Sequence, residues 1–311
     1  MPPKLPFARQ PNCLRCFRRI FKPYTFSRDK LRRGPIGHQR KCSDAEPAGL
    51  VRCASYYARS LHLREARRFY QADAVVTGID LRQRPWGFAQ CLKEVLVKVS
   101  GDPRLRDDPR VLALADHADE FVTAFGYVDQ MAGVPKKDDQ GFSERPHRLT
   151  VFFDPIKIGQ ALAQWGTQPW TGERPIVVPL LLISGPRPPA YLLDADDPAR
   201  ADQRAAFAAA ATEFGLGARV PSAADLAAWG VTPEHFRFPA APPPEAKSAE
   251  QAIVAGTLTW TESLPGWVGE WRMRWHGKDH VWGISGVNYD AAFRDIARGV
   301  LLLASGNGAP D

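Results

Sequence analysis

Apolar and polar residues alternate with two different periods after residue 68, and each period predicts one type of element. Over Phe69–Gly78 apolar residues recur at every second position, which predicts a strand. Over Pro85–Gly101 they recur at helical spacing, which predicts an amphipathic helix that starts after a proline and stops at a glycine. Cys91 lies on the apolar side of this helix, where a small buried hydrophobe is a simpler interpretation than a reactive thiol. Glu94 and Lys98 have the spacing of an exposed i,i+4 pair.

The pattern continues with a helix, a strand and a further helix. Asp108-Pro109 is a typical helix start, and apolar residues keep a helical spacing from there to Phe125. A loop up to Pro146 precedes the alternating stretch Leu149–Phe153, which predicts a strand, and Asp154-Pro155 starts the next helix. Residues 69–166 are therefore predicted to form an α+β unit with helices packed on a small sheet.

The most continuously apolar run of the chain is Arg174–Gly185, and the flanking elements suggest that it organises the fold. A run of this length predicts a strand that is buried on both faces. It is too short to cross a bilayer, which needs about 20 apolar residues. Pro179 has no backbone N–H to donate, so we expect an edge position or a bulge near it.

The remaining pattern predicts a second unit, of the α/β class, over residues 167–305, followed by a short tail, 306–311. It contains an alanine-rich helix near 198–214, a capping box at Ser222–Asp225, a meander of three antiparallel strands and a final helix from Tyr289. The alanine-rich helix is expected to lie against a sheet through its small residues Ala201, Ala205, Ala208, Ala209 and Thr212. In the final helix Asp295 falls on the polar, outward side. The fold class is therefore α+β / α/β, with two small mixed-sheet units.

Charge is distributed unevenly along the chain. Residues 1–68 hold 17 Lys and Arg against 4 Asp and Glu. Since the whole chain carries +7, the rest carries a net charge of −6, which disfavours nucleic-acid binding by the folded part. The basic segment shows neither apolar nor amphipathic periodicity and no secretory signal. It is interpreted as a disordered tail, as a leader produced by a misplaced start or reading frame, or as a zinc site of Cys13, Cys16, His38 and Cys42.

Four residues of the body are candidates for a binding surface. Trp271 and Trp275 share one face of the predicted strand 267–275, where aromatic rings either stack on a ligand or cover a helix. Asp194 and Asp196 follow the central strand and offer carboxylates to a hard cation, although helix capping at Asp197 is the simpler interpretation. The sequence holds no nucleophile elbow, phosphate-binding loop or His-Glu-x-x-His helix, so no catalytic residue, metal or cofactor is predicted.

Several short phrases resemble a known bacterial family. The family is the one catalogued as domain of unknown function 2066. The phrases that resemble it are, in order along the chain, Ala74–Gly78, Leu92–Gly101, Leu149–Asp154, and Trp170 with Arg174-Pro175. The resemblance covers about residues 69–305 and implies an exported envelope protein, without implying catalytic residues. Members typically carry an N-terminal signal, which residues 1–68 do not supply. The order of the C-terminal elements is also similar to the α/β domains of curli-secretion-type envelope lipoproteins, which are binding and assembly modules.

Three functional hypotheses follow. The leading one is a non-enzymatic interaction or assembly protein of the cell envelope, periplasmic or envelope-associated, with an envelope protein as its partner; a cytoplasmic location is the alternative. The second is a hydrolase or transferase with its site at the carboxyl end of strand 176–184, where α/β sheets place ligands. The third is a nucleic-acid- or zinc-binding protein that acts through residues 1–68.

Overall fold

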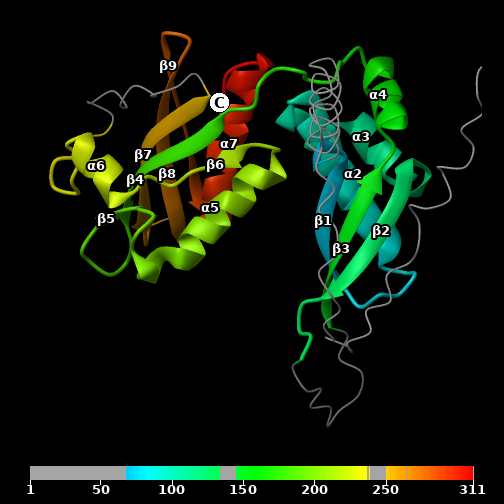
Figure 1. Cartoon of the computed structure of the whole chain (residues 1–311), viewed down its shortest axis with the longest axis horizontal. Coiled ribbons are helices and arrows are strands. Elements are labelled where there is room, and N and C mark those ends of the chain that lie inside the picture. Colours follow the sequence, from blue (N-terminus) through cyan, green and yellow to red (C-terminus); the bar gives the residue numbers. More distant parts are fainter. Residues whose placement is uncertain (1–67, 134–144, 237, 239–249, 264, 311) are drawn as a thin grey trace, which may run out of the picture. The chain divides into compact units, whose positions relative to one another are not determined.

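A computed structural model of the chain (Figure 1) describes residues 68–133, 145–236, 238, 250–263 and 265–310. These residues form α-helices and two β-sheets, one antiparallel and one mixed, which confirms the predicted fold class. The zinc candidates Cys13, Cys16, His38 and Cys42 lie outside the described residues, as does nearly all of the basic segment. The interpretations of that segment therefore stay predictions.

The first sheet has three antiparallel strands in the order β1-β3-β2. Their bounds are β1 Gln71–Thr77, β2 Val122–Asp129 and β3 Pro146–Phe153. Side chains alternate between two faces, and those of Ala72, Ala74 and Val76 are buried along one face of β1. Helix α2, Arg84–Ser100, packs on this inner face through the apolar stripe that its sequence predicts.

Short capped helices surround α2. They are the 3-10 helices η1 (Arg68–Tyr70), η2 (Pro103–Asp107) and η3 (Ala118–Phe121), and the α-helices α3 (Pro109–Ala115) and α4 (Pro155–Gln164). The predicted starts of α3 and α4 are confirmed, since the side chains of Asp108 and Asp154 accept hydrogen bonds from the first backbone N–H groups. Gly101 ends α2 with a left-handed φ of 73°, which favours glycine.

The prediction of one helix from Asp108 to Phe125 is wrong. Helix α3 ends at Ala115, η3 follows, and β2 begins at Val122. The apolar residues kept a helical spacing, but β2 is rich in β-branched and aromatic side chains, which favour a strand once β3 is present to pair with it. The first half therefore has three strands where the sequence pattern indicated two.

The second sheet is built on the apolar run of the sequence. Its strand order is β5-β4-β7-β8-β9, and β6 also pairs with β4. The bounds are β4 Ile176–Ser184, β5 Tyr191–Leu192, β6 Gly217–Ala218, β7 Gln251–Thr261, β8 Gly266–Trp275 and β9 Lys278–Val287. Strands β4 and β7 are parallel, whereas β7, β8 and β9 form the predicted antiparallel meander.

Helices cover both faces of this sheet (Figure 1). They are α5 (Ala201–Glu213, preceded by η4, Pro198–Arg200), α6 (Ala223–Ala228) and α7 (Tyr289–Ser305). Helices α5 and α7 contribute to the large core on one face, and Leu226 of α6 packs with Val178, Leu180 and Ile253 on the other. The capping box at Ser222 and Asp225 is confirmed.

Pro179 occupies a gap in the hydrogen-bonding pattern of β4. The strand pairs with β7 along its whole length without a bulge, so of the two expected arrangements, an edge position or a bulge, the bulge is absent. On its other side β4 pairs with β6 only at Ile176–Val177 and with β5 only at Leu182–Ile183. Proline lies between these two short pairings, where no neighbouring strand requires a backbone N–H.

The alanine-rich helix α5 packs through a different face from the one predicted. Phe207, Ala210 and Ala211 are buried, whereas Ala205 and Ala209 belong to the rim of a groove of about 360 Å³. The aromatic ring of Phe207 meets that of Phe293 on α7 at 5.4 Å between centroids. This large side chain fixed the buried face, and the small residues were left at the surface.

All described residues belong to one compact unit, and its largest hydrophobic cluster includes side chains of both sheets. The division of the chain into two folding units, residues 69–166 and 167–305, stays a prediction. Among the described helices none is long and apolar enough to cross a membrane.

Candidate functional site

The three-stranded sheet has one face that no described helix covers, and we call it the outer face. Its side chains alternate with buried inner-face side chains along β1 and β3, whereas the inner-face side chains of β2 are exposed or half-buried. It consists of Gln71, Asp73, Val75 and Thr77 from β1, Ala124, Gly126 and Val128 from β2, and Pro146, Arg148, Thr150 and Phe152 from β3. A Cβ atom added at Gly126 would meet no other atom within 4 Å, so the surface is open at this point.

Apolar side chains are exposed on the outer face. Val75 and Val128 are each 57% exposed and Phe152 is 39% exposed. Eleven large hydrophobic side chains are exposed among the described residues; ten belong to residues 75–156, and the other is Val281. Single exposed hydrophobic residues are common, but a concentration in one part of a chain is typical of an interaction site.

The outer face also carries two opposite charges with different surroundings. The Asp73 carboxylate accepts a hydrogen bond from the Thr150 hydroxyl at 2.6 Å, from the neighbouring strand. Arg148 lies on the central strand and has Val75 and Val128 as its two cross-strand neighbours. Within the described part of the chain, no acidic side chain forms an ion pair with Arg148. Among the described residues, the outer face thus presents a cation that has no ion-pair partner and lies between two exposed valines.

Helix α2 holds the sheet from the inner side. The Arg84 side chain donates to the Tyr127 hydroxyl at 3.3 Å and lies 4.8 Å from the centroid of the Phe125 ring, so it ties the edge strand β2 to the helix. A Cβ atom at Gly87 would come within 2.5 Å of the Leu149 side chain, so a glycine is required for this close approach. The outer face is therefore supported by a rigid packed layer.

Trp271 does not contribute to a binding surface, because its side chain is completely buried. Its indole N–H donates to the Asp295 carboxylate at 3.0 Å, and the Trp282 indole N–H donates to the backbone oxygen of the same residue at 3.3 Å. The meander thus covers helix α7, as the simpler interpretation of the tryptophans proposed. Asp295 was expected on the outside and is buried; it also pairs with Arg298 at 3.1 Å.

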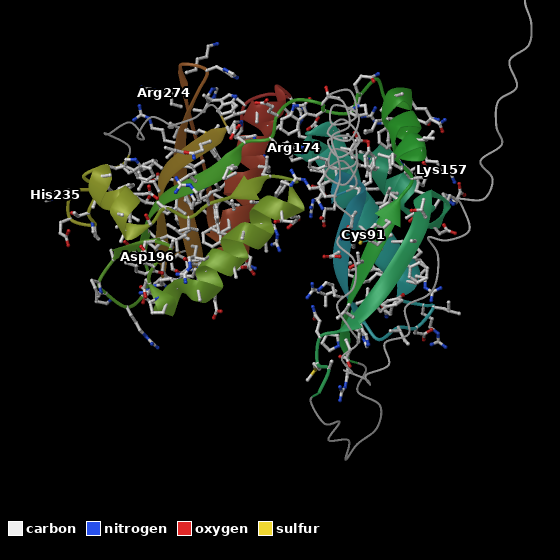
Figure 2. The ribbon with its side chains drawn as sticks, viewed as in Figure 1. Cys91, Lys157, Arg174, Asp196, His235 and Arg274 are labelled. Carbon is white, nitrogen blue, oxygen red and sulfur yellow. The ribbon has the colours of Figure 1, made fainter. Side chains whose placement is uncertain are left out.

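The other candidate residues are not brought together with Trp271. Trp275 lies half-buried at the end of β8, beside the ring of His276. Asp194 accepts hydrogen bonds from the backbone N–H groups of Asp196 and Asp197. Asp196 accepts one from the backbone N–H of Ala223. Figure 2 shows Asp196 in the loop region beside α6. Both carboxylates therefore accept backbone hydrogen bonds in loops, and Asp197 caps η4, which is the helix-capping role that the simpler interpretation gave to it.

The carboxyl end of β4 is filled by aromatic side chains. The Trp267 and Tyr289 rings are in edge contact at 4.9 Å between centroids. Tyr191 lies under the guanidinium of Arg200 and shares hydrogen bonds with the side chain of Gln203. Burial raises the pKa of the Tyr289 hydroxyl, so it stays protonated at neutral pH and cannot serve as a base. This end of the strand is thus a packed aromatic cluster.

Two cations lie in the interior between the secondary-structure elements. Lys98 pairs with Glu94 at 2.5 Å and donates to the backbone oxygen of Gln71 at 3.0 Å. The pair was expected to be exposed, but Lys98 is buried and Glu94 is half-buried. The guanidinium of Arg174 lies between the rings of Phe69 and Trp170, at 4.0 and 4.3 Å from their centroids. Burial lowers the pKa of Arg174 to about 10, which leaves it charged at neutral pH.

Cys91 is buried on the apolar side of α2, as predicted (Figure 2). Burial, together with the nearby Glu94 carboxylate, raises the pKa of its thiol well above the ordinary value, so the thiolate form is suppressed. No group of three or more His, Cys, Asp or Glu side chains with a geometry that suits a metal ion occurs in the part of the chain that the structure describes.

Among the comparisons with known proteins, one family model matches part of the chain. Residues 64–171, about a third of the chain, match the model of a domain of unknown function, DUF8605. This agrees with a resemblance to a family of unknown function, but the family differs from the one that the sequence phrases resemble. No curated protein and no solved structure matches the chain, so the likeness to curli-secretion-type domains has no support from them. The matched region contains the whole three-stranded sheet and its outer face.

Proposed function

We propose that this chain is a non-enzymatic binding protein of the cell envelope and that the outer face is its binding surface. The observation that supports the proposal is the exposure of Val75, Val128 and Phe152 on a sheet face that no described helix covers, within a part of the chain, residues 75–156, that holds ten of the eleven exposed large hydrophobic side chains among the described residues. Burying such side chains against a partner gains about 25 cal/mol per Å² of apolar surface. The region that matches the family model includes this face.

The assignment to the envelope rests on the sequence phrases that resemble an exported family, and it is tested separately by location. The tagged full chain is expressed from its own locus in the native host, and envelope and cytosolic fractions are separated. The proposal expects the protein in the periplasmic or membrane-associated fraction. Recovery in the cytosol alone contradicts the envelope part of the proposal.

The binding part is tested by obstructing the outer face without disturbing the fold. In Gly126→Gln the new side chain projects from the open outer face, and a strand tolerates glutamine better than glycine. Gly159→Gln in α4 is the matched control, because a Cβ atom there also meets nothing within 4 Å. Native-mass analysis of envelope extracts should show a complex for the wild type and for Gly159→Gln, and the monomer for Gly126→Gln. A complex that survives Gly126→Gln excludes the outer face as the binding surface.

A further inference from the structure

We propose that the occupant of the outer face is a protein segment that presents a carboxylate within an apolar stripe, and that Arg148 selects it. The inference rests on the proposed function, because it names the partner of the same surface. It starts from the position of Arg148 in the middle strand of three, where its two cross-strand neighbours are Val75 and Val128.

The surroundings of Arg148 suit a carboxylate that arrives with apolar neighbours. An arginine offers a planar fork of N–H donors that matches both oxygens of one carboxylate. Val75 and Val128 flank this fork and are both more than half exposed, so a docked apolar side chain on either side would shield the pair from water. Exclusion of water strengthens a charge pair, because the local dielectric constant falls.

The outer face does not satisfy Arg148 by itself. Its one carboxylate, Asp73, is held by the Thr150 hydroxyl at 2.6 Å. No other described acidic side chain is within ion-pair distance of the Arg148 guanidinium. A partner that covered the face with apolar groups alone would bury this cation unpaired, at a considerable cost in free energy. The partner therefore has to supply the negative charge.

Charge also argues against the other occupants. Residues 1–68 carry 17 Lys and Arg against 4 Asp and Glu, so this segment and Arg148 repel each other. A second copy that docked face to face around a two-fold axis would bring two Arg148 side chains toward each other. An anionic lipid surface would attract Arg148 and residues 1–68, but the part of the chain after residue 68, which contains the outer face, carries a net charge of −6 and is repelled by such a surface.

The test uses the full chain in its native host, with a photo-reactive amino acid at Val128. Adduct yield is compared between the wild type, Arg148→Lys, Arg148→Glu and the control Arg187→Glu, which reverses the charge of another exposed arginine. We expect about a tenfold loss of adduct in Arg148→Glu, a smaller loss in Arg148→Lys and no change in the control. Thermal melting of each purified variant establishes that the fold is retained.

The adduct itself identifies the occupant. Mass spectrometry of the linked peptide should show a segment of another protein that contains Asp or Glu, and replacing that residue by Lys in the partner should restore the yield with Arg148→Glu. An adduct to a second copy, to residues 1–67 or to lipid overturns the inference, as does an adduct whose yield is independent of Arg148. Absence of any adduct at Val128 above the level obtained at Val281 removes the proposed function as well.

Discussion

Replacing Asp295 by alanine tests the internal packing of the second sheet. This carboxylate is 5% exposed on α7, where one oxygen accepts from the Trp271 indole at 3.0 Å and the other pairs with Arg298 at 3.1 Å. Asp295→Ala removes both interactions and leaves the indole N–H of a fully buried side chain without its acceptor.

The expected loss follows from these two interactions. A buried donor that loses its partner costs about 1–3 kcal/mol. The ion pair contributes less than about 1 kcal/mol, because the Arg298 side chain is a third exposed and solvent screens it. We therefore expect Asp295→Ala to lower the free energy of unfolding by about 1–4 kcal/mol. Asp290→Ala, at an exposed position in the first turn of the same helix, should cost less than about 1 kcal/mol.

The charge of Asp295 is tested through the pH dependence of stability. Burial raises the pKa of this carboxyl in the folded protein, although Arg298 and the Trp271 hydrogen bond oppose the shift. The folded state therefore binds the proton more tightly than the unfolded state does. The stability gained from this binding is complete below the unfolded pKa, about 3.9, and is lost as pH rises through the folded pKa. Asp295→Asn still accepts from Trp271 but carries no charge, so its stability relative to the wild type should increase as pH rises from about 4.

Chemical denaturation followed by tryptophan fluorescence measures all three variants at several pH values. The reasoning is refuted if Asp295→Ala is no less stable than Asp290→Ala, since the indole would then not depend on this carboxylate. A stability difference between Asp295→Asn and the wild type that does not change with pH contradicts the raised pKa.

Further substitutions test strand β7, helix α4 and the Lys98–Glu94 ion pair. Gly256→Ala should destabilise the protein by about 1–3 kcal/mol, because its Cβ would lie 2.2 Å from the backbone oxygen of Glu270. Gly159→Ala, where a Cβ meets nothing within 4 Å in a helix, should instead stabilise by about 1 kcal/mol; equal effects in chemical denaturation would contradict both expectations. Lys98→Ala should cost about 3–5 kcal/mol because it leaves the largely enclosed Glu94 carboxylate, whose side chain is 16% exposed, without its partner, and Glu94→Gln in the same chain should recover part of that loss in thermal unfolding.

The sequence predicted those elements whose pattern is local. Helix α2 was readable from its proline, its apolar spacing and Gly101, and the meander β7–β9 was readable from alternation and turn residues. Strand β2 was missed because Val122 and Phe125 fit a helical spacing as well as a strand, and only pairing with β3 decides between them. The packed face of α5 was wrong because one phenylalanine outweighed a row of alanines.

The candidate site depended on contacts between distant residues, which no local pattern encodes. Asp295 was placed outside because charged residues are rarely buried, yet Trp271 requires an acceptor there. The outer face was not singled out from the sequence, although the alternation in β1 and β3 was visible. Exposed Val75 and Phe152 could have suggested it, since an apolar residue on each face of a strand is typical of a sheet that is covered on both sides.

The proposal that the outer face is the binding surface is tested most directly by photo-cross-linking in the native host. The photo-reactive amino acid replaces one or the other of two valines with matched exposure. Val128 and Val281 are 57% and 60% exposed, so solvent access to the reactive group is nearly equal, and they belong to different sheets. A discrete protein adduct from Val128, and none from Val281, is the predicted result. Equal yields from the two positions, or an adduct from Val281 alone, would contradict the assignment of binding to the outer face.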